Sequence, residues 1–148
     1  MEVQQDFKEL LELFNEHNVE YIIVGGYALA FHGAPRYTGD IDIFVKPDSK
    51  NAKQILTVLD KFGFGSVGIK QEDLEKPNKV IQLGFPPVRI DIITSISGLS
   101  WDEAVNERVV GEYGDITVYY IGRSHYIINK KASGRKKDLA DLEALGEE

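Results

Sequence analysis

The chain has no cysteine, which excludes disulfides, thiolate metal sites and cysteine nucleophiles. It also has no apolar run near the ~18 residues that a membrane-spanning helix needs. Its acidic, amphipathic start, MEVQQDFKEL, lacks the basic stretch and apolar run of a secretory signal. We therefore expect a cytoplasmic protein that does not enter a membrane.

A broad basic surface is missing as well. The formal net charge is -7, with 17 Lys and Arg residues against 24 Asp and Glu residues. A surface with this net negative charge repels polyanions, which argues against a protein that holds nucleic acid mainly through a basic face. The basic residues are unevenly spread, however, and five of them lie within residues 130–137. A local anion site near that segment is compatible with the overall charge.

The hydrophobic pattern predicts alternating helices and strands. We expect helices at residues 4–17, 27–32, 51–62, 101–107, 124–131 and 137–145. We expect strands at residues 20–24, 40–45, 80–83, 88–93 and 116–121. Residues 63–78 carry mixed signals and read as a loop with one helical turn near residues 71–74. No repeat or linker divides the chain, so we predict one α/β (α+β) domain over residues 1–148, a mixed twisted sheet with flanking helices.

Two aspartates interrupt an otherwise apolar strand in the segment GDIDIFV. Residues i and i+2 of a strand point to the same face, roughly 6.5 Å apart, so Asp40 and Asp42 share a face. Asp91 has a similar setting in VRIDII, where it shares one side of the strand with Arg89. If the two strands are neighbours, three carboxylates converge on one patch.

Converging carboxylates repel one another and raise each other's pKa unless a cation compensates. Mg²⁺ is the natural cation for an all-oxygen site, and two such ions roughly 3.5–4 Å apart suit this spacing, with Mn²⁺ as a substitute. The competing interpretation is the solvated face of a half-exposed sheet. For a single aspartate that interpretation is preferable, whereas D-I-D together with a third aspartate in an apolar strand favours the metal site.

Gly25 and Gly26 lie where a buried strand is expected to turn into a helix. Glycine lets the backbone approach a ligand closely, and a helix N-terminus offers N–H groups to phosphate oxygens. Glycine also occurs at such turns for conformational reasons alone, but its place shortly before the D-I-D strand favours the phosphate site. The tyrosines are better interpreted as core or rim residues than as base-stacking platforms, but the next residue, Tyr27, is a candidate to line a nucleotide pocket.

Together these segments, IVGGYALAFHGAPRYTGDIDIFV and VRIDII, resemble the nucleotidyltransferase superfamily, which has a DNA polymerase β-type palm. The chain is most similar to small bacterial nucleotidyltransferase-like proteins and to the nucleotidyltransferase toxins of abortive-infection systems. The similarity lies in the lead-in RYTGDID at residues 36–42 and in the terminal segment NKKASGRKKDLADLEAL. It runs from about residue 21 to residue 145 and implies a minimal nucleotidyltransferase palm.

The resemblance also implies roles for particular residues. Asp40 and Asp42 would hold the metal ions, Asp91 would bind one ion and help to activate the attacking hydroxyl, and Gly25 and Gly26 would receive the triphosphate. Many relatives carry serine at the second glycine position, so here a backbone N–H would replace a hydroxyl contact. Relatives that modify tRNA ends or aminoglycosides usually carry a further helical domain for the acceptor, for which this chain has little room.

Other residues are expected to contact the nucleotide because of their charge or their place beside the metal strand. These residues are Arg36, Thr38, Lys130 and Arg135. A lysine would offset phosphate charge, and an arginine can do so with two hydrogen bonds. For the terminal residues the alternative is a solvated helix, in which Lys137 and Asp141 form an ordinary i,i+4 pair.

The sequence thus predicts a metal-dependent nucleotidyltransferase. A hydroxyl of an acceptor, protein or RNA, would attack the α-phosphate of a nucleoside triphosphate, and pyrophosphate would leave. One alternative is a non-catalytic module that binds nucleotide or protein, as one half of a toxin–antitoxin-type pair whose partner protein is encoded nearby. An intact carboxylate set argues against that alternative. A second alternative is a magnesium-binding fold with hydrolytic chemistry.

Overall fold

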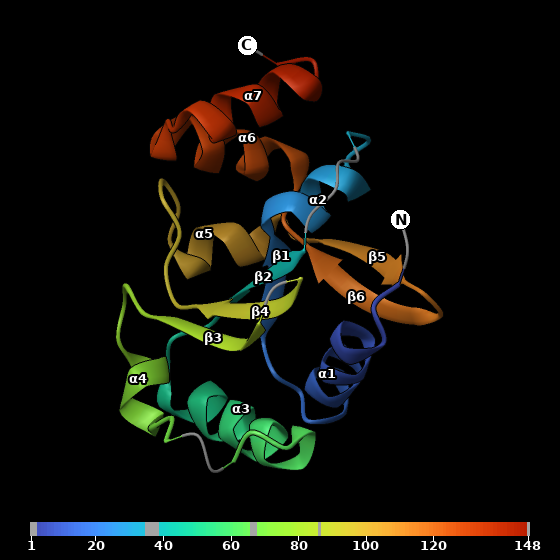
Figure 1. The fold of residues 1–148 in the computed structure, drawn as a ribbon. Helices are drawn as coiled ribbons and strands as arrows, with labels where there is room; N and C mark the ends of the chain where they lie inside the picture. Colours follow the sequence, from blue (N-terminus) through green and yellow to red (C-terminus); the bar gives the residue numbers. More distant parts are fainter. Residues whose placement is uncertain (1–2, 35–38, 66–67, 86, 148) are drawn as a thin grey trace.

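A computed structural model describes residues 3–34, 39–65, 68–85 and 87–147. It contains one six-stranded sheet with helices on both sides (Figure 1). The strands are β1 (Tyr21–Val24), β2 (Asp40–Val45), β3 (Val80–Phe85), β4 (Val88–Ile93), β5 (Val109–Tyr113) and β6 (Ile116–Tyr120). The helices are α1 (Gln5–Glu16), α2 (Gly25–Phe31), α3 (Ser49–Phe62), α4 (Gln71–Glu75), α5 (Trp101–Asn106), α6 (Arg123–Ser133) and α7 (Lys136–Ala144).

The strand order is β3-β4-β2-β1-β6-β5, so the aspartate-bearing strands β2 and β4 are neighbours. These two strands run parallel, as do β1 and β6, whereas the remaining neighbours are antiparallel. This mixed sheet confirms the predicted fold class. It also places β2 between β1, which ends at the diglycine turn, and β4.

Helices α1 and α3 cover one side of the sheet, while α5, α6 and α7 lie on the other side (Figure 1). Both α1 and α3 are amphipathic, and their apolar residues lie on the face toward the sheet. The fully buried residues on this side include Phe7, Leu10, Leu11, Phe14, Ile41, Ile43, Val45, Ile55 and Val58. Burying each such side chain contributes about 1.5–3 kcal/mol relative to exposing it. The alternation along β2 therefore directs the isoleucines to this core and the aspartates to the opposite face.

The opposite face of β2 is only partly covered. Phe44, on the same face as Asp42, packs edge-to-face against Trp101 of α5, with ring centroids 5.2 Å apart. A capping box stabilises the N-terminus of helix α5. In it the Ser100 hydroxyl accepts a hydrogen bond from the Glu103 N–H, and the Glu103 carboxylate accepts one from the Ser100 N–H. The covered residue therefore lies at one end of β2 and the carboxylates at the other.

Most elements agree with the predicted ones to within about two residues at each end, and three differences matter here. Strand β5 was not predicted, α2 begins at Gly25 rather than at residue 27, and α4 extends the expected turn to residues 71–75. Within the described part of the chain, none of the helices combines the length and the apolar character that crossing a membrane would require.

Candidate active site

The three predicted carboxylates lie on adjacent strands and line one cavity. In the parallel pairing of β2 with β4, Asp42 is opposite Asp91 and Asp40 is opposite Arg89. Neighbouring strands are about 4.8 Å apart, so all of these side chains share a small patch of one face. The cavity above them has a volume of about 670 Å³, and all three aspartates belong to its wall. The predicted convergence is thus present in the fold.

Arg89 is closely engaged with two of the three carboxylates. Its Nε donates to Asp91 Oδ1 at 2.9 Å, and its Nη2 donates to Asp91 Oδ2 at 3.0 Å and to Asp40 Oδ2 at 2.8 Å. These are charge-assisted hydrogen bonds, and the pair with Asp91 is bidentate. The hydrogen bond with Asp91 raises the pKa of Arg89, which therefore stays charged. Alternation placed Arg89 beside Asp91 in the sequence, but its link to Asp40 follows only from the strand order.

Asp42 is the carboxylate without such a partner. Among the described residues, none forms a hydrogen bond or a close ion pair with it. Burial raises its pKa to about 6, the charges of Asp91 and Asp40 act in the same direction, and Lys130 and Lys137 oppose them. The described residues therefore leave the negative charge of Asp42 without a nearby cation to balance it, and a bound cation would be stabilised there.

The donor set fits a hard divalent cation in its chemistry, because carboxylate oxygens are the ligands that Mg²⁺ prefers. The geometry is different: across the residues that the structure describes, no group of three or more His, Cys, Asp and Glu side chains is arranged to hold a metal ion. Arg89 provides the positive charge beside Asp40 and Asp91 instead. A metal ion that binds Asp91, or Asp40 through its Oδ2 atom, therefore requires the guanidinium to move.

Gly25 brings the backbone against the carboxylate patch. It has φ +67°, and a Cβ built on it would lie 2.2 Å from Asp42 Oδ2. Both the backbone conformation and the lack of space exclude a larger residue here without rearrangement. Gly25 lines the cavity, whereas Gly26 is buried and does not belong to the cavity wall.

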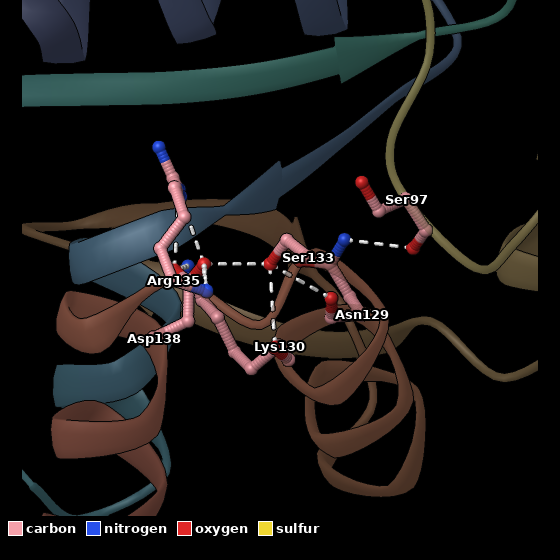
Figure 2. Close-up of polar contacts among 6 residues, drawn as sticks. All are labelled: Ser97, Asn129, Lys130, Ser133, Arg135 and Asp138. Carbon is pink, nitrogen blue, oxygen red and sulfur yellow. Dashed lines mark hydrogen bonds and ion pairs between the residues drawn. The ribbon is translucent and has the colours of Figure 1, made fainter.

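The opposite wall of the cavity is the corner between α6 and α7, which Figure 2 shows with its polar contacts. Asp138 is fully buried there and accepts hydrogen bonds from Ser133 Oγ at 2.7 Å and from Lys130 Nζ at 3.3 Å. Arg135 donates to it from Nε at 2.8 Å, from Nη2 at 3.1 Å and from its backbone N–H at 3.2 Å. Figure 2 also shows Asn129, which ties α6 to the loop after β4 through the carbonyl oxygen of Ser97, 2.9 Å away.

This arrangement has a clear electrostatic result. Burial alone would raise the pKa of Asp138, but the hydrogen bonds from Arg135 and Ser133 and the charge of Lys130 hold it well below its usual range. Asp138 is therefore ionised at neutral pH. It fixes Lys130, which is itself 6% exposed, and Arg135 in positions that line the cavity facing the carboxylates.

Comparisons with known proteins show the family and the fold of the chain. A family model described as "Nucleotidyltransferase of unknown function (DUF6036)" matches residues 1–146. The chain belongs to this nucleotidyltransferase family. Among curated proteins, no match was found.

Solved structures of nucleotidyltransferases have a similar fold. TM1012 of Thermotoga maritima, provisionally described as a nucleotidyltransferase, has a TM-score of 0.63 at 15% identity, with 93% of this chain and 88% of that chain covered. The lincosamide antibiotic adenylyltransferase LnuA, solved with lincomycin bound, has a TM-score of 0.57 at 16% identity, with 99% and 98% covered. An antigenic nucleotidyltransferase-like protein from Paracoccidioides brasiliensis has a TM-score of 0.56 at 16% identity, with 95% and 72% covered. At these identities the likeness concerns the fold.

Of the three other predicted site residues of this nucleotidyltransferase, the structure describes only Tyr27. Tyr27 is 4% exposed, and its ring packs edge-to-face against Phe7 and Tyr113, with centroids 5.7 Å and 5.8 Å apart. It does not belong to the wall of the carboxylate cavity, because the first turn of α2 directs it into the core. This placement argues against the expected contact with a nucleotide. Arg36 and Thr38 lie outside the described residues.

Sequence reasoning missed two features of the cavity. One is the engagement of Arg89 with Asp40 and Asp91, and the other is the role of Asp138 as the buried anchor of Lys130. The segment SGRKKD offered a signal for the second feature, because a Ser-Gly turn between two helices brings basic residues and an aspartate to one corner.

Proposed function

We infer that this nucleotidyltransferase transfers a nucleoside monophosphate from a nucleoside triphosphate to an acceptor hydroxyl. The observation that carries this proposal is the shared cavity of about 670 Å³, with Asp40, Asp42 and Asp91 on its sheet side and Lys130 and Arg135 on its helix side. Carboxylates, which are the ligands that Mg²⁺ prefers, facing anchored cations suit a polyphosphate substrate. A plain solvated face of a sheet would not require a buried lysine opposite it.

In the proposed reaction, an oxygen–phosphorus bond forms between the acceptor hydroxyl and the α-phosphate, and the bond from the α-phosphate to the β-phosphate oxygen breaks. Asp40, Asp42 and Asp91 would hold two Mg²⁺ ions, with Mn²⁺ as a substitute, and bound ions would neutralise charge on the attacking and leaving oxygens. Asp91 accepts the proton of the acceptor hydroxyl. Lys130 and Arg135 bind the phosphates that depart as pyrophosphate.

The acceptor is constrained by charge. The chain carries a net charge of -7, and two of the four cations in the cavity wall, Lys130 and Arg135, are already paired with Asp138. This balance weighs against an RNA acceptor and in favour of a protein hydroxyl. A small molecule is a further candidate, because LnuA is described as an adenylyltransferase with lincomycin bound and 98% of its chain is covered here.

A second candidate function follows from Arg89. Its ion pairs with Asp40 and Asp91 satisfy two carboxylates without a metal ion, as expected of a module that binds nucleotide or a partner protein but does not catalyse. The partner of a toxin–antitoxin-type pair, encoded nearby, stays a prediction from the sequence, as does the cytoplasmic location.

One assay separates these functions. The purified chain is incubated with Mg²⁺, each of the four nucleoside triphosphates labelled at the α-phosphate, and candidate protein, RNA and small hydroxyl acceptors. Transfer predicts pyrophosphate release with label retained on an acceptor, and orthophosphate release would indicate hydrolysis instead. The double variant Asp40→Ala, Asp42→Ala should lower turnover by at least about 10³-fold.

The matched control is Asp102→Asn, which removes an exposed aspartate of α5 away from the cavity. It should retain turnover. Nucleotide binding without any turnover, unchanged in the double variant, would contradict the transferase and support the binding module.

A further inference from the structure

Arg89 has a charge and a position that the transfer reaction described above does not use. It lies in strand β4, two residues before Asp91 and directly opposite Asp40 in the neighbouring strand. Its side chain is 26% exposed and makes three hydrogen bonds of 2.8 to 3.0 Å to those two carboxylates. A guanidinium in this place offsets the repulsion between two anions that the strand pairing forces together.

We propose that Arg89 is the resting counter-cation of the carboxylate patch and that a divalent ion binds only by displacing it. This proposal rests on the metal-dependent function inferred above and concerns the regulation of the same site. An ion held by Asp91 and Asp40 needs oxygens that Arg89 already uses, namely both oxygens of Asp91 and the Oδ2 atom of Asp40. A guanidinium and a metal ion therefore compete for two of the three carboxylates.

The competition sets the order of binding. Displacing Arg89 breaks charge-assisted hydrogen bonds, so the free protein binds a divalent ion weakly. A bound triphosphate changes the balance, since Mg²⁺ is typically held by one or two carboxylates together with substrate phosphates. The phosphates also offer the released guanidinium a new set of acceptor oxygens. The metal ion and the nucleotide consequently enter together rather than the ion ahead of the nucleotide.

Mn²⁺ binding to the nucleotide-free protein tests this proposal, with electron paramagnetic resonance counting the free ion. We expect Arg89→Gln to bind Mn²⁺ at least about tenfold more tightly than the natural chain, because the competing cation is gone. Arg89→Lys keeps a charge but loses the bidentate geometry and should fall between the two. Arg123→Gln is the matched control, since Arg123 is an exposed arginine of α6 paired with Glu147 and outside the cavity wall, and it should bind as the natural chain does.

A second measurement covers variants that fold less well. In chelator, Arg89→Gln should melt at a lower temperature than the natural chain, because the carboxylates then repel without compensation. Added Mn²⁺ should raise its melting temperature by more than it raises that of the natural chain. A tenfold gain in affinity together with this larger shift supports the proposal.

Equal Mn²⁺ affinity in Arg89→Gln and the natural chain would overturn the proposal. If neither binds the ion alone, the titration is repeated with a non-hydrolysable triphosphate. Binding there without any advantage for Arg89→Gln would overturn the role of Arg89 and leave the proposed transfer intact. No binding of Mn²⁺ under either condition would overturn the metal-dependent function and the role of Arg89 together.

Discussion

Asp42 and Asp138 are both aspartates associated with the same cavity, and their surroundings shift the pKa in opposite directions. Asp42, on the sheet side, has a pKa raised to about 6 by burial and by two neighbouring carboxylates. Asp138, behind the helix side, has a pKa held below its usual range by Arg135, Ser133 and Lys130. Within the described part of the chain, Asp42 therefore has too few positive or hydrogen-bonding partners to offset its burial, whereas the partners of Asp138 more than offset the burial of that residue.

The helix side and the sheet side of the cavity therefore differ in how completely their charges are paired. The corner of α6 and α7 is a complete polar network, in which a buried anion fixes two cations within hydrogen-bonding distance. The sheet side is incomplete at Asp42, and unmet charge beside a cavity is where a ligand of opposite charge gains most. Removing a charge should therefore have opposite effects on stability on the two sides.

The largest expected effect is that of Asp138→Asn. This substitution leaves Lys130 charged and buried without its partner, and breaking a buried pair in this way costs about 3–5 kcal/mol. Urea unfolding at pH 7.5 measures the loss, with Asp102→Asn as the control. Asp102 is exposed in the first turn of α5, where the loss of its charge should cost no more than about 1 kcal/mol. A loss as small as that of the control would contradict the description of Asp138 as the anchor of the corner.

Gly25→Ala should come next. A residue with a Cβ is strained at φ +67°, and the new Cβ would also collide with Asp42 Oδ2, which together cost about 2–4 kcal/mol. Gly114→Ala is the matched control, because Gly114 has nearly the same φ (+64°) but the nearest atoms lie 3.5 Å from its Cβ position, an ordinary contact distance. The difference in unfolding free energy between the two variants measures the collision, and equal losses would show that the close approach to Asp42 has no energetic weight.

Asp42→Asn should have the opposite sign, stabilising the fold by about 1–3 kcal/mol at pH 7.5 while abolishing turnover. The folded-state pKa of about 6 lies above the unfolded value of 3.8, so the folded chain binds the proton more tightly. The contribution of Asp42 to stability is therefore lost as the pH rises from about 4 to about 6. Unfolding in urea at pH 4 and pH 7.5 tests this, because the advantage of Asp42→Asn should vanish at pH 4. An equal advantage at both values would contradict the raised pKa.

Much of this site followed from local patterns. The alternation in residues 40–45 and 88–93 predicted both strands and the face that carries Asp40, Asp42 and Asp91. The hydrogen bond from Arg89 to Asp40 depends on which strands are neighbours, and a single strand's pattern does not contain that information. Tyr27 follows the diglycine directly, yet one helical turn directs it into the core.

Strand β5 shows the same limit in the fold itself. Its sequence, VVGEY, has a glycine at the centre and an exposed valine, so its alternation is weak. Gly111 is there because of a tertiary contact: a Cβ built on it would lie 2.6 Å from the ring of Phe31, which stacks on Tyr120. The residue that obscures the strand pattern is therefore required by packing from a distant helix.

The smallest expected effect sharpens the comparison on the helix side. Lys137 lines the cavity and influences the pKa of Asp42, but within the described residues it makes no ion pair, in contrast to Lys130. Lys137→Ala should therefore change the free energy of unfolding by less than about 0.5 kcal/mol while weakening triphosphate binding by about two- to fivefold. Lys136→Ala, which removes the adjacent exposed lysine outside the cavity wall, should leave both quantities unchanged. Equal weakening by the two variants in fluorescence titrations would mean that the cluster acts through general charge, whereas a loss confined to Lys137→Ala would show that the cavity itself selects which lysine meets the phosphates.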